Sequence, residues 1–142
     1  MKRCIIILSL FIIQNQIFPE EEHFYNFSNG VMEKLQYARE LCIMDETGVY
    51  TGNDHNLIVE EYENYLLGTK DEILNYINTY KERQSINELL KIIIFEIEKI
   101  ENGIKDSIPE IDSIEIMENI DLMQNIMMSI YVIKYYENIL DG

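Results

Sequence analysis

The chain has 142 residues, 47% of them hydrophobic and 26% charged, with 26 acidic against 11 basic residues and a formal net charge of −15. This hydrophobic content is too high for an acidic disordered tail, and 2 Pro and 6 Gly are too few for a linker or a low-complexity protein. Neutralising a phosphate backbone requires clustered Lys and Arg side chains. We therefore expect one acidic globular domain that does not bind nucleic acid.

The N-terminus has the order of charged, apolar and polar residues that is typical of a secretory signal. Lys2 and Arg3 precede an apolar run over residues 4–13, and residues 14–16 are polar. A transmembrane helix needs about 20 apolar residues, so this run is too short to be one. We predict a signal peptide over residues 1–18, followed by a helical domain over residues 19–142 that has no stable membrane insertion after processing. The alternative is a cytosolic domain in which residues 4–13 are part of the core.

Export would place the mature protein in the periplasm or outside the cell. Its charge would become −17, because Lys2 and Arg3 leave with the signal. Cys4 would leave as well, so that Cys42 would have no intramolecular disulfide partner.

Helical spacing of apolar residues recurs along the mature chain. Val31, Leu35, Ala38 and Cys42 share one face of a helix, and turn-forming residues fill positions 45–56. Gly68 is typical of a helix end. Three later segments begin with Ser or Thr followed three residues on by Glu, which is the spacing of a capping box. We therefore predict an all-α fold, a small antiparallel helical bundle or array of four to six helices, and list their starts as Ser28, Asn56, Thr69, Ser85 and Ser107.

Two segments leave a choice open. Residues 92–98 are rich in β-branched side chains, which favours a strand, but the apolar spacing continues to Ile104 and favours a helix. Residues 109–140 keep the helical period and form one helix or two. The methionines of this segment are expected in the core, and they are Met117, Met123, Met127 and Met128.

The sequence carries no phosphate-binding loop, dinucleotide fingerprint or Cys-x-x-Cys motif, and too few His and Cys for a zinc site. We therefore predict no catalytic, cofactor or metal site and no enzymatic activity. The alternative is a thiol enzyme in which His55 activates Cys42. The simpler interpretation is that Cys42 fills the core, because it continues the apolar stripe that contains Ala38.

Acidic residues alternate with tyrosines between positions 60 and 80. Carboxylates on a polar helix face attract basic partners, and Tyr is enriched at protein interfaces. Half of these tyrosines, such as Tyr62, Tyr65 and Tyr80, also have the spacing of core residues. We assign the predicted partner-binding set to Glu60, Glu61, Glu63, Tyr65, Asp71, Glu72 and Tyr76.

These patterns favour a small exported binding protein that occupies a basic surface of a protein partner. Inhibitors and immunity-type proteins of secreted toxins fit this physical description. The alternatives are a cytosolic acidic decoy that mimics nucleic acid and the thiol enzyme that uses Cys42.

Overall fold

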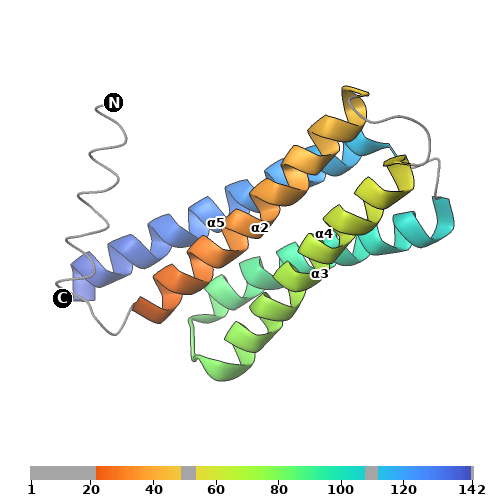
Figure 1. Ribbon diagram of the computed structural model, residues 1–142. Helices are drawn as coiled ribbons and strands as arrows, with labels where there is room; N and C mark the ends of the chain where they lie inside the picture. The colour runs from red at the N-terminus through yellow and green to blue at the C-terminus, as the bar shows by residue number, and fades with distance from the viewer. Residues whose placement is uncertain (1–21, 49–53, 108–111, 142) are drawn as a thin grey trace, which may run out of the picture.

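The computed structural model describes residues 22–48, 54–107 and 112–141 (Figure 1). All of its regular structure is helical, and no strand is present in these ranges. The helices are α2 (Glu22–Glu46), α3 (Asp54–Thr79), α4 (Gln84–Ser107) and α5 (Ser113–Asp141). The predicted signal peptide over residues 1–18 lies outside the described ranges.

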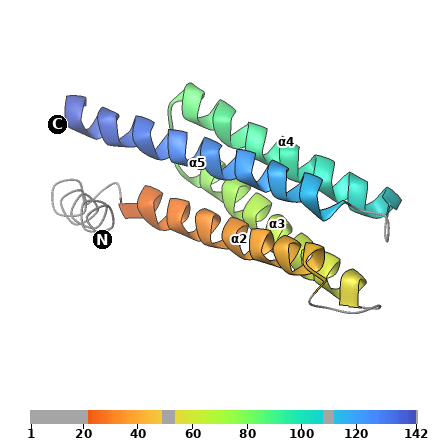
Figure 2. The ribbon, with the colours of Figure 1, turned by 90° about the horizontal axis from the view of Figure 1, so that it is seen from above.

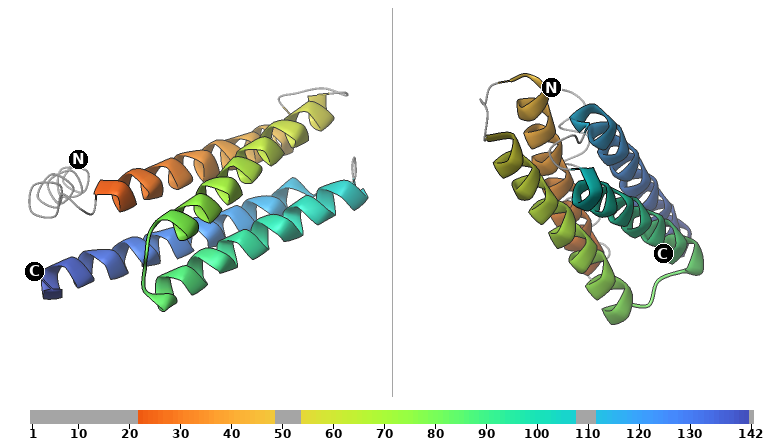
Figure 3. Two further views of the ribbon diagram at one scale, coloured as in Figure 1. Left: turned by 90° about the horizontal axis from the view of Figure 1, so that it is seen from below. Right: turned by 90° about the vertical axis from the view of Figure 1, so that its right-hand side faces the viewer.

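The four described helices form an antiparallel bundle of two hairpins. One hairpin consists of α2 and α3, the other of α4 and α5, and the two pack face to face (Figures 1 and 3). Each helix has two neighbours, because α2 also contacts α5 and α3 also contacts α4. Seen from above, the C-terminal end of α5 extends past the first turn of α4 (Figure 2). This arrangement confirms the predicted helical bundle at the lower limit of four helices.

The predicted apolar face of α2 is buried. Val31, Leu35, Ala38 and Cys42 are each at most 1% exposed and belong to a core that draws on all four helices. Spacings of three and four residues place these side chains on one stripe of the helix, so that one packed interface buries all of them.

Aromatic rings fill the end of the bundle where α2 begins. The rings of Phe27 and Tyr76 stack with their centroids 4.0 Å apart, and Phe24 meets Tyr76 edge-on at 6.3 Å. On the α5 side, the rings of Tyr25 and Tyr131 meet at 5.3 Å. Such pairs contribute about 0.5–1.5 kcal/mol beyond the burial of their area.

The first two predicted helix starts are too late in the chain. Ser28 is buried inside α2, which begins at Glu22, and Asn56 lies in the first turn of α3, which begins at Asp54. The turn-rich segment predicted over residues 45–56 is shorter at both ends, since α2 continues to Glu46 and α3 begins at Asp54. Residues 49–53 lie outside the described ranges.

The predicted break at Gly68 and Thr69 is wrong, because α3 continues through both residues. The Thr69 hydroxyl donates a hydrogen bond of 2.9 Å to the carbonyl oxygen of Tyr65, one turn earlier in the same helix. A hydroxyl that is satisfied in this way cannot cap a new helix. Thr69 and Glu72 therefore have the spacing of a capping box but do not begin a helix.

The last two starts differ in accuracy. Helix α4 begins at Gln84, one residue before the predicted Ser85, whereas Ser107 is the last residue of α4. Asp112 caps α5 instead, and its carboxylate accepts a hydrogen bond of 2.9 Å from the backbone N–H of Ile114.

The two open choices are settled by the helices themselves. Residues 92–98 are helical, as favoured, and residues 113–141 form one helix. Met123 and Met127 are fully buried in the core, and Met117 packs against it. Met128 was expected in the core and is 52% exposed, so that assignment is wrong.

A buried ion pair joins the α3–α4 connection to α5. The Lys134 ammonium lies 3.1 Å from a carboxylate oxygen of Glu82, and both side chains are less than 10% exposed. The Tyr76 hydroxyl donates a 2.6 Å hydrogen bond to the other Glu82 oxygen, and the Lys134 Nζ lies 5.5 Å from the centroid of the Phe24 ring. Lys134 continues the apolar stripe of α5, and its burial is made tolerable by Glu82 and by Glu137, whose carboxylate lies 4.0 Å from the ammonium.

We predict that Lys134→Met lowers the free energy of unfolding by about 3 kcal/mol, because Glu82 is left as a buried, uncompensated charge. Adding Glu82→Gln should restore much of the loss. The measurement is urea denaturation followed by circular dichroism. Arg39→Met is the matched control, because its pair with Asp121 is more exposed and its loss should cost less than about 1 kcal/mol. Equal losses in the two single variants would contradict the role of burial.

Candidate functional site

A small groove on the outside of the α2–α3 hairpin combines an apolar lining with carboxylates. Its volume is about 140 Å³. Four residues of α2 and two residues of α3 line it, and they are Tyr37, Glu40, Leu41, Met44, Glu61 and Tyr65. Neither Lys nor Arg is among these six residues.

The apolar part of the groove is held in place by the core. Leu41 and Tyr65 are partly buried and pack against core residues. The rings of Tyr37 and Tyr65 meet across the two helices with their centroids 5.4 Å apart. Leu41 and Tyr65 are thus held in place by their contacts with the core.

The acidic part of the groove is open to solvent. Glu40 and Glu61 are exposed and lie on different helices. The Tyr37 hydroxyl donates a 3.1 Å hydrogen bond to Glu33, and this bond to a carboxylate raises the pKa of Tyr37. The phenol therefore stays protonated and adds no negative charge of its own.

This combination matches the chemistry of a long cationic side chain. The methylene stem of Lys or Arg packs on apolar surface while its charged head stays at the polar rim. Glu40 and Glu61 supply acceptors for that head, and charge-assisted hydrogen bonds are stronger than neutral ones.

The predicted partner-binding residues divide between this groove and other places. Glu61 and Tyr65 line the groove, and Glu60 is exposed on the outer side of α3. Glu63 is half-buried, and at 3.6 residues per turn it lies about 200° around the helix from Glu61. The structure therefore does not bring Glu61 and Glu63 together on one face.

The second half of the predicted set is further along α3. Asp71 is exposed, but the Glu72 carboxylate lies 2.7 Å from the ammonium of Lys34 and is partly neutralised by it. Tyr76 is only 4% exposed, because its ring stacks on Phe27. The expectation that Tyr76 lies on an exposed face is therefore wrong.

The α2 half of the groove was missed by the sequence analysis. Tyr37, Leu41 and Met44 recur at spacings of four and three residues, which marks a second stripe beside the core stripe of α2. That spacing was visible in the sequence. Its pairing with Glu61 and Tyr65 was not, because it depends on how α2 and α3 are aligned.

The thiol that the alternative hypothesis requires is buried. Cys42 is 1% exposed, and desolvation followed by the nearby Asp45 carboxylate raises its pKa to about 12. His55 Nδ1 lies 2.7 Å from one Asp45 oxygen, and the Ser113 hydroxyl donates to the other. The Asp45 carboxylate thus lies between the Ser113 hydroxyl and the His55 imidazole. In a catalytic triad the imidazole lies between the nucleophile and the carboxylate instead.

Tyr62 lies in the same buried region. Its side chain is fully buried, and its hydroxyl has no hydrogen-bond partner among the described residues. Burial, followed by the neighbouring Cys42 and Asp45, raises the pKa of Tyr62. Both ionisable groups are therefore kept neutral by the core.

In the described ranges, no three His, Cys, Asp or Glu residues are grouped so that they can hold a metal ion. None of the described helices has an apolar stretch of the length that a membrane crossing requires.

We predict that the free energy of unfolding falls as the pH rises above 9. The unfolded chain then loses the Cys42 proton near the ordinary thiol pKa of 9.0, whereas the folded chain keeps it up to about 12. The slope from this one proton is about −1.4 kcal/mol per pH unit within that window. Urea denaturation at pH 8 and pH 10 should show a smaller loss for Cys42→Ala than for the wild type. Identical losses would show that the thiol is accessible in the folded chain.

No protein-family model matches the chain, and the comparisons with curated proteins and with solved structures found no match either. The function is therefore inferred from the residues and geometry described above.

Proposed function

We propose that the chain is a small exported acidic helical protein that binds a basic surface of a protein partner, in the manner of an inhibitor or an immunity-type protein. The observation that carries this proposal is the groove between α2 and α3. Its apolar lining and its two exposed glutamates suit a Lys or Arg side chain.

The charge of the whole chain supports the same mode of action. A net charge of −15, or −17 without residues 1–18, produces a field that attracts a cationic protein before contact. Such a field raises the rate of encounter more than the strength of the final contact. The groove then adds the short-range contacts that a field alone does not provide.

The described residues favour binding over catalysis. Cys42 is buried with a raised pKa, and His55 contacts Asp45 through Nδ1. A thiol nucleophile needs exposure and a lowered pKa. We therefore propose that the chain acts by covering a partner surface and carries out no reaction of its own.

The site of action that we propose is the periplasm or the extracellular space. This part of the proposal depends on the pattern of residues 1–18. The proposed binding needs no cofactor.

We predict that Glu61→Lys weakens binding to the partner by at least about tenfold, because it places a like charge where the cationic side chain enters. The partner is captured from the exported fraction, identified, and titrated against the purified chain by fluorescence anisotropy. Glu118→Lys on α5 is the matched control, since it makes the same charge change at an exposed position away from the groove. Its effect should be less than about threefold.

Salt gives a second criterion for the same experiment. The association rate should fall as the ionic strength rises to 0.1 M and above, where exposed charges are screened beyond about 10 Å. Equal effects of Glu61→Lys and Glu118→Lys would mean that only the net charge acts. A folded Cys42→Ser variant that loses its function would favour the thiol enzyme instead.

We predict that the mature protein begins between residues 18 and 22. The measurement is N-terminal sequencing or intact mass of the protein recovered from the exported fraction. A full-length chain that stays in the cytosol would contradict export, and it would favour the acidic decoy that mimics nucleic acid.

A further inference from the structure

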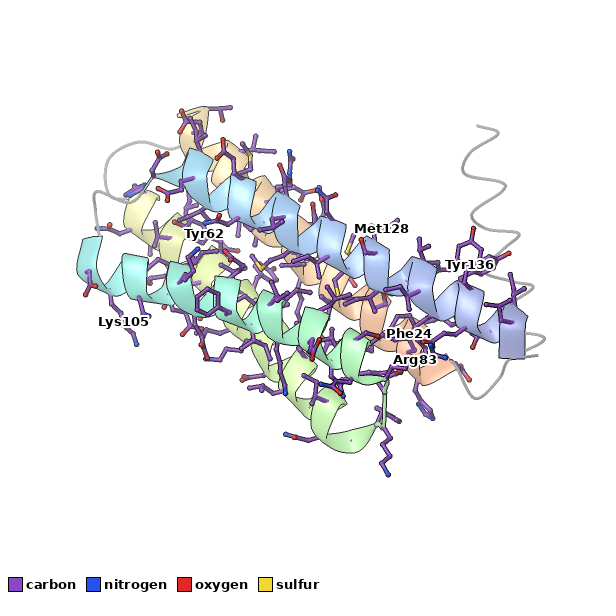
Figure 4. All side chains as sticks on the ribbon, turned by 180° about the vertical axis from the view of Figure 1, so that it is seen from behind. Phe24, Tyr62, Arg83, Lys105, Met128 and Tyr136 are labelled. Atoms are coloured by element: carbon purple, nitrogen blue, oxygen red, sulfur yellow. The ribbon has the colours of Figure 1, made fainter. Side chains whose placement is uncertain are left out.

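The outward side of the last part of α5 is apolar. We call it the outer face of α5 and define it by five residues: Met128, Val132, Tyr136, Ile139 and Leu140. Their exposed fractions are 52%, 46%, 58%, 50% and 82%, in that order. Met128 and Tyr136 lie along the edge of α5 that is turned away from the core residue Phe24 (Figure 4). Exposed apolar side chains gathered on one part of a helix are typical of an interaction site.

The outer face of α5 carries no charge in a strongly acidic chain. Between residues 128 and 140, the charged residues are Lys134 and Glu137. Lys134 is buried and pairs with Glu82, whereas the Glu137 carboxylate lies 2.6 Å from the exposed Arg83 at the border of the face. The five residues that define the face therefore offer no carboxylate to a partner with a basic surface.

The spacing of the face indicates that its partner is a helix. Met128, Val132, Tyr136 and Ile139 follow one another at intervals of four, four and three residues. Spacings of three and four residues place side chains along one side of a helix, where a second helix can pack. The core side of α5 has the same pattern from Ile116 to Lys134, so that α5 has two seams, and the bundle fills one of them.

The same face is hollowed next to α4. A pocket of about 280 Å³ lies there, and its lining comes from Arg83, Val132, Ile133, Tyr136, Glu137 and Leu140. Two members of this lining, Arg83 and Glu137, are paired with each other. The remaining members present apolar surface, which offers room for a large apolar side chain.

We propose that the outer face of α5 is a homodimer interface whose occupant is a second copy of this chain. Two copies related by a two-fold axis present the same face to each other, so that uncharged surface meets uncharged surface while the acidic groove on α2 and α3 points away. The exposed fractions of the five residues correspond to roughly 500 Å² per copy, so that pairing which covers them completely buries about 1,000 Å² in total, at the lower limit of a specific interface. This inference goes beyond the proposed function and does not depend on it.

The salt dependence of an association distinguishes the outer face of α5 from the groove. The dimer brings two acidic molecules together, so that screening of their mutual repulsion strengthens it. Binding of a basic partner at the groove weakens with salt instead. Opposite salt dependences therefore identify which surface an observed association uses.

Sedimentation velocity of the purified protein tests the proposal between 1 and 500 µM. We expect a monomer–dimer equilibrium whose dissociation constant decreases when NaCl is raised from 50 to 500 mM. Val132→Glu should raise that constant at least about 100-fold, because it buries an unpaired carboxylate. Asn75→Glu on α3 is the matched control, since it adds the same charge at an exposed position off the face. Circular dichroism checks that both variants fold.

A chain that remains monomeric at 500 µM, or dimers that Val132→Glu does not weaken, would overturn the proposal. The uncleaved chain offers one competing occupant, its own apolar residues 4–13. Oxidation of a Tyr136→Cys variant distinguishes the two, since Cys42 is buried. An intramolecular disulfide with Cys4 in a monomer would show that the chain covers its own face.

Discussion

The structure depends on how few positive charges are available to balance the acidic ones. The chain has 26 acidic residues and 11 basic ones. Among the residues that the structure describes, five basic side chains form ion pairs between different helices or connections of the bundle, and they are Lys34, Arg39, Lys70, Arg83 and Lys134. Three of the four neighbouring helix pairs receive such a contact: Lys34 joins α2 to α3, Arg39 joins α2 to α5, and Lys70 joins α3 to α4. The α4–α5 hairpin is joined by Arg83, which precedes α4 and pairs with Glu137. Basic residues are thus concentrated at helix junctions, where they set alignment, and exposed pairs of this kind contribute less than about 1 kcal/mol each.

That placement determines the character of the outer surface. Carboxylates that are not at a junction, such as Glu40, Glu60 and Glu61, remain exposed. The field of the molecule is therefore a consequence of how the bundle is held together. A partner that approaches α2 and α3 meets this field first and the apolar groove afterwards. Charge and shape then select the same kind of ligand, a basic side chain with a long apolar stem.

The fold was predictable from the sequence because the apolar period is a property of each helix alone. The stripe from Val31 to Cys42 needed only the 3.6-residue repeat to be recognised. Helix ends were less predictable, because a Ser or Thr hydroxyl can satisfy either a new helix or the one that it already belongs to. Thr69 bonds to the carbonyl of Tyr65, so its local pattern was that of a cap and its environment was that of a helix interior.

The candidate site was predictable only by half, for a related reason. Glu61 and Tyr65 could be identified from α3, but the groove also needs Leu41 and Met44 from α2. Tyr76 is of a residue type that is enriched at interfaces. It is nevertheless buried, because its ring stacks on Phe27 in the bundle. Whether a tyrosine or glutamate side chain is exposed depends on the neighbouring helix. The periodicity of a single helix carries no information about that neighbour.

Helix α5 also shows that the periodicity of one helix does not determine which of its apolar residues are buried. Its sequence is apolar on two sides, and periodicity alone assigns Met127 and Met128 to the core equally well. The bundle has room for one seam, and the packing of α2 and α4 against α5 buries Met127 and leaves Met128 outside. The outer face of α5 is uncharged and apolar, although the chain is strongly acidic. A carboxylate on this face would destabilise the protein only if another surface covered it. Acidic residues occur at exposed positions of the other helices, whereas the one acidic residue between positions 128 and 140 is Glu137, which pairs with Arg83. This surface therefore differs from the groove in both chemistry and place.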